Sequence, residues 1–208
     1  MKKRSASAWS PNWEDEPDLS LLRRAYDKLS VDPTGAIEDL RTLSDAGSVM
    51  SMLYIAGAYR TKIIGTDVRD SIDWYVKAIK SGSVIATYSL AVLYRNIKMF
   101  DQSIYYANMG VEFGYPPSMY LLGVIYSNGE GVQKDILAAK ELWERASKLG
   151  HLFSKRNLAF WLMGGRFGAL QVIRGFAMWL SLLWEGLPVV LREPDSWRLE
   201  GILEPRRL

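Results

Sequence analysis

The chain has 208 residues, and 49% of them are apolar, which is enough for one globular domain or a short array of repeats with a sizeable core. The formal net charge is +3, and the longest basic run is Lys2-Lys3-Arg4, so the basic clusters typical of nucleic-acid binding are missing. The absence of cysteine excludes disulfides, thiolate nucleophiles and zinc–thiolate sites.

The first residues, MKKRSASAWSPNWEDEPD, begin with basic residues that no apolar run follows. We therefore expect no signal peptide and a cytoplasmic chain. The acidic cluster at 14–18 suggests a metal site, but the segment contains proline and offers no further ligands. A flexible arm over residues 1–17, solvated or docked on a partner, is the favoured interpretation.

Two sequence registers recur between residues 18 and 187. One is a glycine at intervals of 32 to 36 residues: Gly47, Gly82, Gly114, Gly150 and Gly186. The other consists of Tyr26, Tyr59, Tyr94, Tyr126 and Leu162, each with an apolar residue four positions earlier. Apolar residues at i and i+4 share one helix face, and a glycine in the left-handed conformation commonly ends a helix. The pattern predicts five stacked helix pairs, at about 18–47, 48–83, 84–115, 116–151 and 152–187, followed by a tail from 188 to 208.

Three positions before each of Tyr59, Tyr94, Tyr126 and Leu162 stands an alanine or a glycine. Such a small residue lets the backbone of a neighbouring helix come close. The first pair has Arg23 there, so we expect it to be degenerate. The segment SMYLLGVIYSNGEGVQKDILAAKELWERASKLGH (118–151) resembles a Sel-one-like repeat, a relative of the tetratricopeptide repeat. The matching residues are Leu122, Gly123, Tyr126, Gly129, Gly131, Val132, Asp135, Ala139, Trp143, Ala146 and Gly150. The other repeats depart further, and the resemblance covers roughly residues 20–187.

The resemblance implies an all-α fold, a right-handed α-solenoid of about five antiparallel helix pairs. It also implies a function as an adaptor or scaffold, because members of this family are often bacterial and are rarely catalytic. The glycines of Gly129-Glu130-Gly131 invite comparison with a phosphate-binding loop, but such a loop needs Lys followed by Ser or Thr, whereas Lys134 precedes Asp135. We interpret the loop as an inter-helix turn whose glycines adopt positive φ, with Asp135 capping the next helix.

No catalytic constellation is found in the sequence. The chain has one histidine, His151, which we expect at a helix start or on the surface. We therefore predict a protein that is not an enzyme and that needs no cofactor and no metal. Three of the eight tryptophans, Trp74, Trp143 and Trp179, fall at repeat positions, which favours a core role.

In tetratricopeptide-like arrays the first helix of each pair lines a concave groove. Transferring that pattern predicts a groove for a peptide or protein segment, lined by arginine, asparagine and aromatic side chains. The residues predicted to line this groove are Arg60, Tyr88, Arg95, Asn96, Tyr120, Asn128, Arg156 and Phe160. An ordinary exposed helix face is the alternative interpretation.

The last repeat departs from the pattern in a second way. The repeats are 36 residues apart, so adding 36 to the residue numbers of the charged solvent face in the preceding repeat gives the equivalent positions here. Among these positions are the apolar Phe176, Leu180 and Trp184. The residues expected to point inward are Met178, Trp179, Leu182 and Leu183. A terminal repeat with apolar residues nearly all round needs a cover. Three covers remain open: the tail 187–203 folded back through Val189, Val190, Leu191, Trp197 and Leu199; a protein partner or second copy; or peripheral membrane contact through 175–191.

The sequence thus predicts a non-enzymatic scaffold that captures a partner segment in its groove and docks its last repeat, in the cytoplasm or at the inner face of a membrane. A membrane-attached assembly factor, for envelope or polysaccharide machinery as in some relatives, and an enzyme of unknown type are the competing functions. The oligomeric state is left open.

Overall fold

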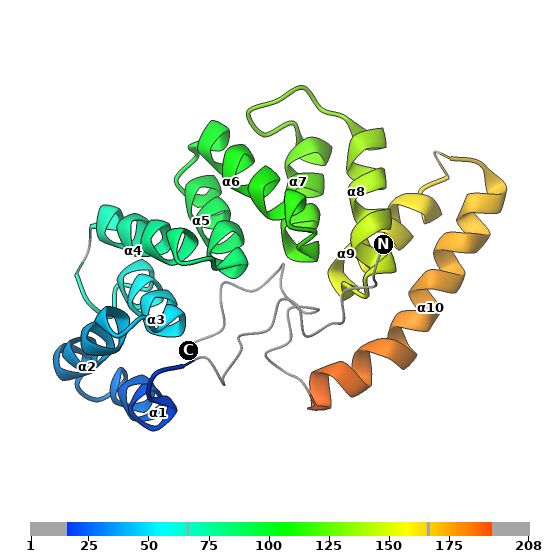
Figure 1. Ribbon diagram of the computed structural model, residues 1–208. Coiled ribbons are helices and arrows are strands. Elements are labelled where there is room, and N and C mark those ends of the chain that lie inside the picture. Colours follow the sequence, from blue (N-terminus) through cyan, green and yellow to red (C-terminus); the bar gives the residue numbers. More distant parts are fainter. Residues whose placement is uncertain (1–15, 66, 166, 193–208) are drawn as a thin grey trace. The chain divides into compact units, whose positions relative to one another are not determined.

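The computed structural model of the chain describes residues 16–65, 67–165 and 167–192, and every regular element in these ranges is an α-helix (Figure 1). The helices are α1 Leu19–Lys28, α2 Pro33–Asp45, α3 Val49–Arg60, α4 Val68–Lys80, α5 Val84–Asn96, α6 Phe100–Glu112, α7 Pro116–Asn128, α8 Ile136–Lys148, α9 Leu152–Met163 and α10 Ala169–Arg192. The predicted all-α fold of paired helices is confirmed. The expected arm and tail lie mostly outside the described residues, at 1–15 and 193–208.

The chain divides into two compact units, with the division between Leu93 and Tyr94 inside α5. In the first unit α1 packs on α2, α2 on α3, and α3 on α4. The core of this unit is built from aliphatic side chains of α1, α2 and α3, including the fully buried Leu22, Leu40 and Ile55. Arg23 is exposed beside them, consistent with the degenerate first repeat.

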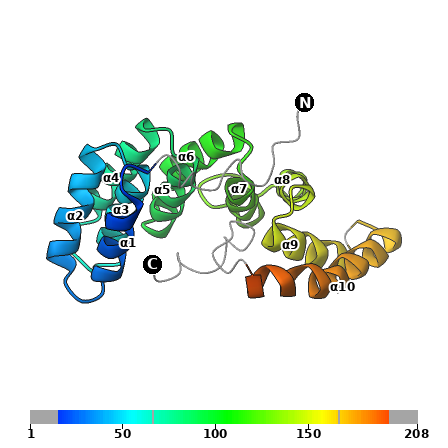
Figure 2. The same ribbon diagram turned by 60° about the horizontal axis from the view of Figure 1, so that its bottom comes forward.

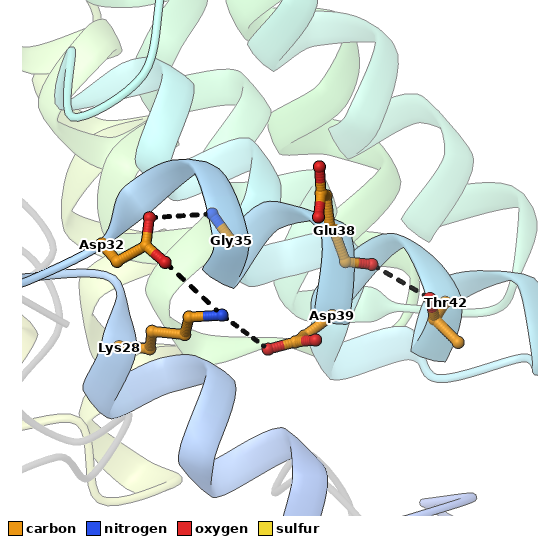
Figure 3. Close-up of polar contacts among 6 residues, drawn as sticks. All are labelled: Lys28, Asp32, Gly35, Glu38, Asp39 and Thr42. Atoms are coloured by element: carbon orange, nitrogen blue, oxygen red, sulfur yellow. Dashed lines mark hydrogen bonds and ion pairs between the residues drawn. The ribbon is translucent and has the colours of Figure 1, made fainter.

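The turn between α1 and α2 shows how local sequence begins a helix (Figure 3). The Asp32 carboxylate accepts a hydrogen bond from the Gly35 backbone N–H at 3.0 Å and so caps α2. The Lys28 ammonium lies 3.5 Å from a carboxylate oxygen of Asp32 and 3.3 Å from one of Asp39. Because all three side chains are partly exposed, this pairing contributes little stability and mainly orients the turn.

The register glycines end helices as predicted in four of the five repeats. Gly47, Gly82, Gly114 and Gly150 have φ values of 98°, 91°, 77° and 97°. After Gly150, the His151 backbone N–H donates to the Ala146 carbonyl at 3.1 Å, which satisfies a carbonyl at the end of α8. The glycine therefore reverses the chain, and a new helix begins at once.

In the second unit each helix from α6 to α10 packs on the next one. Its core gathers around Trp143 of α8, which is 1% exposed and packs with Tyr120, Ala139, Leu158 and Leu162. The Trp143 indole N–H donates to the Tyr120 carbonyl at 3.2 Å. The core role predicted for Trp143 is confirmed, and Trp74 is half-buried against the core of the first unit.

Gly123 explains the small residue of the repeat signature. A Cβ placed on Gly123 would lie 2.8 Å from Cδ1 and 3.0 Å from Cε2 of the Trp143 indole, and closer still to its nitrogen. No side chain fits between the α7 backbone and this ring. Glycine therefore sets the spacing between α7 and α8.

The last repeat departs from the expected boundary. Gly186 lies within α10 rather than at its end, and the helix continues through Pro188 to Arg192. Val189, Val190 and Leu191, which the fold-back hypothesis placed in the tail, belong to α10 itself, with Val189 buried. Since proline has no N–H, it removes one hydrogen bond from the ladder without ending this helix.

Candidate functional site

The loop Gly129-Glu130-Gly131 is an inter-helix turn, as predicted. Its glycines have φ values of 75° and 69°, and Asp135 caps α8 by accepting from the Ala138 N–H at 2.9 Å. A Cβ on Gly131 would collide with the Phe100 side chain. The loop is therefore shaped by packing and by the chain reversal, and glycine is required at both positions.

Glu130 binds two of the predicted groove residues. Its carboxylate accepts hydrogen bonds from Arg95 Nε at 2.6 Å and Arg95 Nη2 at 2.8 Å, and from Asn128 Nδ2 at 2.7 Å. The hydrogen bonds from Arg95 hold the pKa of Glu130 below its usual range, against the opposing effect of burial. We call Arg95, Asn128 and Glu130 the loop clamp, because they tie the end of α5 to the α7–α8 turn.

The structure places Tyr120 in the core rather than on an open surface. It is 6% exposed, and burial raises the pKa of its hydroxyl, while the nearby Arg156 lowers it. Tyr120 was expected to line an open groove, but α9 covers it. In an isolated helix pair the same position would be exposed. The Tyr120 ring packs on His151, with centroids 5.3 Å apart, and on Phe153, with centroids 6.4 Å apart.

Arg156 is half-buried on α9 above this aromatic group. Its guanidinium lies 5.0 Å from the centroid of the Phe153 ring, and its Nη2 donates to Asn157 Oδ1 at 3.2 Å. Across residues 16–65, 67–165 and 167–192 it forms no ion pair with a carboxylate. Phe160, one turn further along α9, is 54% exposed. We call Arg156, Asn157 and Phe160 the α9 surface.

The other predicted groove residues behave differently. Asn96 is exposed at the end of α5, and Tyr88 is half-buried in the first unit. Burial raises the pKa of the Tyr75 hydroxyl, and Arg60, which lies beside it in the first unit, partly opposes that shift. The Arg60 Nε is buried and lacks a hydrogen-bond acceptor among the described residues.

His151 is a structural residue. It is fully buried, and its Nδ1 accepts from the Ser154 backbone N–H at 3.2 Å, which makes it the N-cap of α9. The helix-start interpretation is thus confirmed. No group of three His, Asp or Glu side chains converges to hold a metal ion in the ranges that the structure describes.

The outer face of α10 is apolar and exposed. Phe176, Leu180 and Trp184 lie on it as the repeat comparison indicated, and Trp184 is 87% exposed. The face is wider than expected, because Trp179 and Leu183, predicted to point inward, are exposed as well, Leu183 by 64%. We call the apolar arc the ten large side chains Leu170, Ile173, Phe176, Trp179, Leu180, Leu183, Trp184, Leu187, Val190 and Leu191.

The lack of a following helix among the described residues explains the error at Trp179. Its counterpart Trp143 is covered by α9, where the Trp161 ring lies 6.2 Å from it, centroid to centroid. No helix follows α10 within the described residues. A residue that is core in one repeat therefore becomes surface in the last one, and the sequence pattern of the helix alone gives no signal of this.

The inner side of α10 packs closely on α9. A Cβ on Gly175 would lie 2.8 Å from the Ala159 carbonyl oxygen and 2.9 Å from Leu162 Cβ. Arg174 pairs with Glu144 of α8 at 3.3 Å, and Glu185 pairs with Lys155 of α9 at 2.6 Å. By length and composition alone, residues 169–191 of α10 suffice to cross a membrane.

Comparison with known proteins agrees with this architecture. The Sel1 repeat matches residues 50–83 and 116–151. No protein of curated function matches the chain. Among solved structures, a Sel1 repeat protein from Oxalobacter formigenes superposes with a TM-score of 0.63 at 19% identity, covering 76% of this chain and 70% of that one.

A second structure, c5321, is described as a protective antigen of uropathogenic Escherichia coli with an SLR fold. It superposes with a TM-score of 0.62 at 16% identity, covering 92% of this chain. The present chain spans 50% of its length. At these identities the likeness establishes the fold. The chain therefore carries Sel1 repeats at two sites within an α-solenoid fold of the Sel1-repeat type.

Proposed function

We propose that the protein is a non-enzymatic interaction scaffold whose α9 surface binds a carboxylate-bearing segment of a partner protein. Sel1 repeats generally mediate protein–protein contacts, which supports the class of function. The observation that carries the proposal is the state of Arg156: half-buried, held over an aromatic ring, and without a carboxylate partner among the described residues.

The chemistry of Arg156 suits a carboxylate. The guanidinium is planar and presents its N–H donors in a fork that matches the two oxygens of a carboxyl group. The Phe153 ring beneath the guanidinium and hydrogen bonds to Asn157 and Tyr120 hold the group in place, and its five N–H donors exceed these contacts, which leaves donors for a ligand. An acidic side chain or a chain terminus of the partner would supply the anion.

Phe160 extends the site with an apolar contact. It lies four residues after Arg156 on the same face of α9 and is exposed. Aromatic and arginine side chains together are the groups most often responsible for binding energy at protein interfaces. The preferred partner segment thus carries a carboxylate followed by an apolar residue at a distance of about one helical turn.

The loop clamp has a different role in this proposal. Since Arg95 and Asn128 already bind Glu130, they shape the turn rather than offer free donors to a partner.

The test is affinity capture from the native cell with three versions of the full chain: the unmodified protein, Arg156→Glu and Arg145→Glu. Arg145 is an exposed arginine of α8, and its substitution makes the same change of charge away from the α9 surface. We expect the captured partner to be retained by Arg145→Glu and lost by Arg156→Glu. Equal capture by both variants would contradict the proposal, and so would a catalysed reaction that Arg156→Glu abolishes without unfolding the protein.

The apolar arc of α10 is a second docking surface and supports the alternative of a membrane-attached assembly factor. Ten exposed large apolar side chains leave on the order of 1,000 Å² of apolar surface, whereas the largest patch of a typical monomer is about 300–600 Å². We infer from its size that this surface docks on a partner or a membrane.

A further inference from the structure

We propose that α10 is an interfacial membrane anchor that lies in the plane of a lipid bilayer with its apolar arc among the acyl chains. The proposal rests on the geometry of α10 and is independent of the α9 surface. Four properties of the helix lead to it: the width of the arc, the placement of its charges, its tryptophans, and its contacts with α9.

The arc is too wide for a single partner helix. At 3.6 residues per turn, the ten side chains of the arc cover about half of the helix circumference. Two packed helices, with axes about 8–10 Å apart, contact each other along a narrower stripe. An α10–α10 contact between two copies would therefore leave part of the arc in water. A continuous apolar medium covers it completely.

The charges of α10 avoid the arc. Between residues 169 and 191 the sequence has two charged side chains, Arg174 and Glu185. Both lie along one edge of the helix and pair with side chains of α8 and α9, namely Glu144 and Lys155. The arc thus offers no charge by which a protein partner could be selected. A hydrocarbon environment requires none.

Two tryptophans lie on the arc, five residues apart. Trp184 is the most exposed side chain of the arc, and the Trp179 ring stacks on Phe176 with centroids 6.1 Å apart. Tryptophan is enriched where proteins meet the boundary of headgroups and acyl chains, because its ring is apolar and its N–H needs a polar partner.

The contacts with α9 favour an in-plane helix over a spanning one. Figures 1 and 2 both show α9 lying alongside α10, and the contacts run from Gly175 against Ala159 to Glu185 against Lys155. A spanning α10 would carry the charged groups of α9, including Arg156, into the hydrocarbon, which is costly. In the plane of the membrane, α9 stays on the aqueous side and only the arc is immersed.

The test is flotation of the full chain with phosphatidylcholine vesicles and with vesicles that also contain phosphatidylglycerol. Because the arc is uncharged, we expect binding to both, with less than about a twofold change between low salt and 0.5 M salt. Leu183→Glu and Trp184→Glu should each lower the bound fraction at least tenfold. Leu137→Glu, at an exposed leucine of α8, is the matched control and should bind as the unmodified chain does. Circular dichroism of each variant shows whether it is folded.

Three results would overturn the proposal. One is a lipid-free dimer that Trp184→Glu dissociates, together with no flotation, which assigns the arc to a second copy. Another is flotation only after removal of residues 193–208, which assigns it to the tail. The third concerns orientation: the chain has no cysteine, so Ala169→Cys and Arg192→Cys can each be labelled from outside the vesicles with an impermeant maleimide. Both should react, and protection of one end would indicate a spanning helix.

Discussion

Gly123→Ala tests how tightly the signature glycine sets the spacing of α7 and α8. Replacing glycine by alanine in an open helix stabilises a protein by about 1 kcal/mol. At Gly123 the new methyl group would lie 2.8 Å and 3.0 Å from carbons of the Trp143 indole, well inside van der Waals contact. The ring is buried and holds a hydrogen bond to Tyr120, so it cannot move freely.

The expected change in the free energy of unfolding is the balance of three terms, two of which destabilise the protein. Overpacking a core costs about 1–3 kcal/mol, and loss of the buried indole hydrogen bond costs a further ~1–3 kcal/mol. After subtraction of the propensity gain, Gly123→Ala should destabilise the protein by about 1–5 kcal/mol. For a unit of roughly 100 residues, each kcal/mol corresponds to a fall in Tm of about 4–8 °C.

The chain supplies its own matched control. Gly186 is also inside a helix, but a Cβ there would meet only Leu152 Cδ1, at 3.9 Å. Gly186→Ala should therefore raise the stability by up to about 1 kcal/mol. Thermal and urea unfolding, followed by circular dichroism and tryptophan fluorescence, measure both variants. If Gly123→Ala proves as stable as Gly186→Ala, the close approach of Trp143 to the α7 backbone does not exist in solution.

Two further predictions concern polar contacts of the second unit. Glu130→Gln should lower the stability by about 1–2 kcal/mol at neutral pH, because a bidentate charged contact becomes a neutral one. The folded state lowers the pKa of Glu130, so this contact contributes fully above the usual glutamate pKa range and is lost as the pH falls through the folded value. The urea midpoints of the two proteins should therefore converge once the pH is below that value. A difference that persists unchanged there would contradict the assignment. His151→Ala should cost about 1–3 kcal/mol, because it removes the N-cap of α9 and leaves a void beneath Tyr120, and an unchanged Tm would refute this.

Features that depend only on residues close together in the sequence could be predicted from it. The helix ends at Gly47, Gly82, Gly114 and Gly150 follow from backbone conformation, and the cap at Asp135 follows from a side chain three residues before its donor. Gly186 shows the limit of this reasoning. The same residue in the same register lies inside a helix, because the residues after it continue the apolar stripe instead of starting a new pair.

The candidate site was less predictable because its contacts are tertiary. Arg95 and Glu130 are 35 residues apart, about one repeat, and only the stacking of repeats brings them together. Opposite charges at that separation are the signal that could have revealed the pair. The burial of Tyr120 and the exposure of Trp179 depend on which helix comes next, and that information lies outside the helix in question.

His151 gives the protein a built-in spectroscopic reporter. It is the single histidine of the chain, so proton NMR will show one set of imidazole signals without any isotope label. The centroid of its ring lies 5.3 Å from that of Tyr120 and 6.2 Å from that of Phe153, the ring over which the Arg156 guanidinium lies. We expect a ligand that moves Arg156 to shift Phe153 as well, and the changed ring current should displace the histidine resonances. Occupancy of the α9 surface can thus be read from a residue that never touches the ligand.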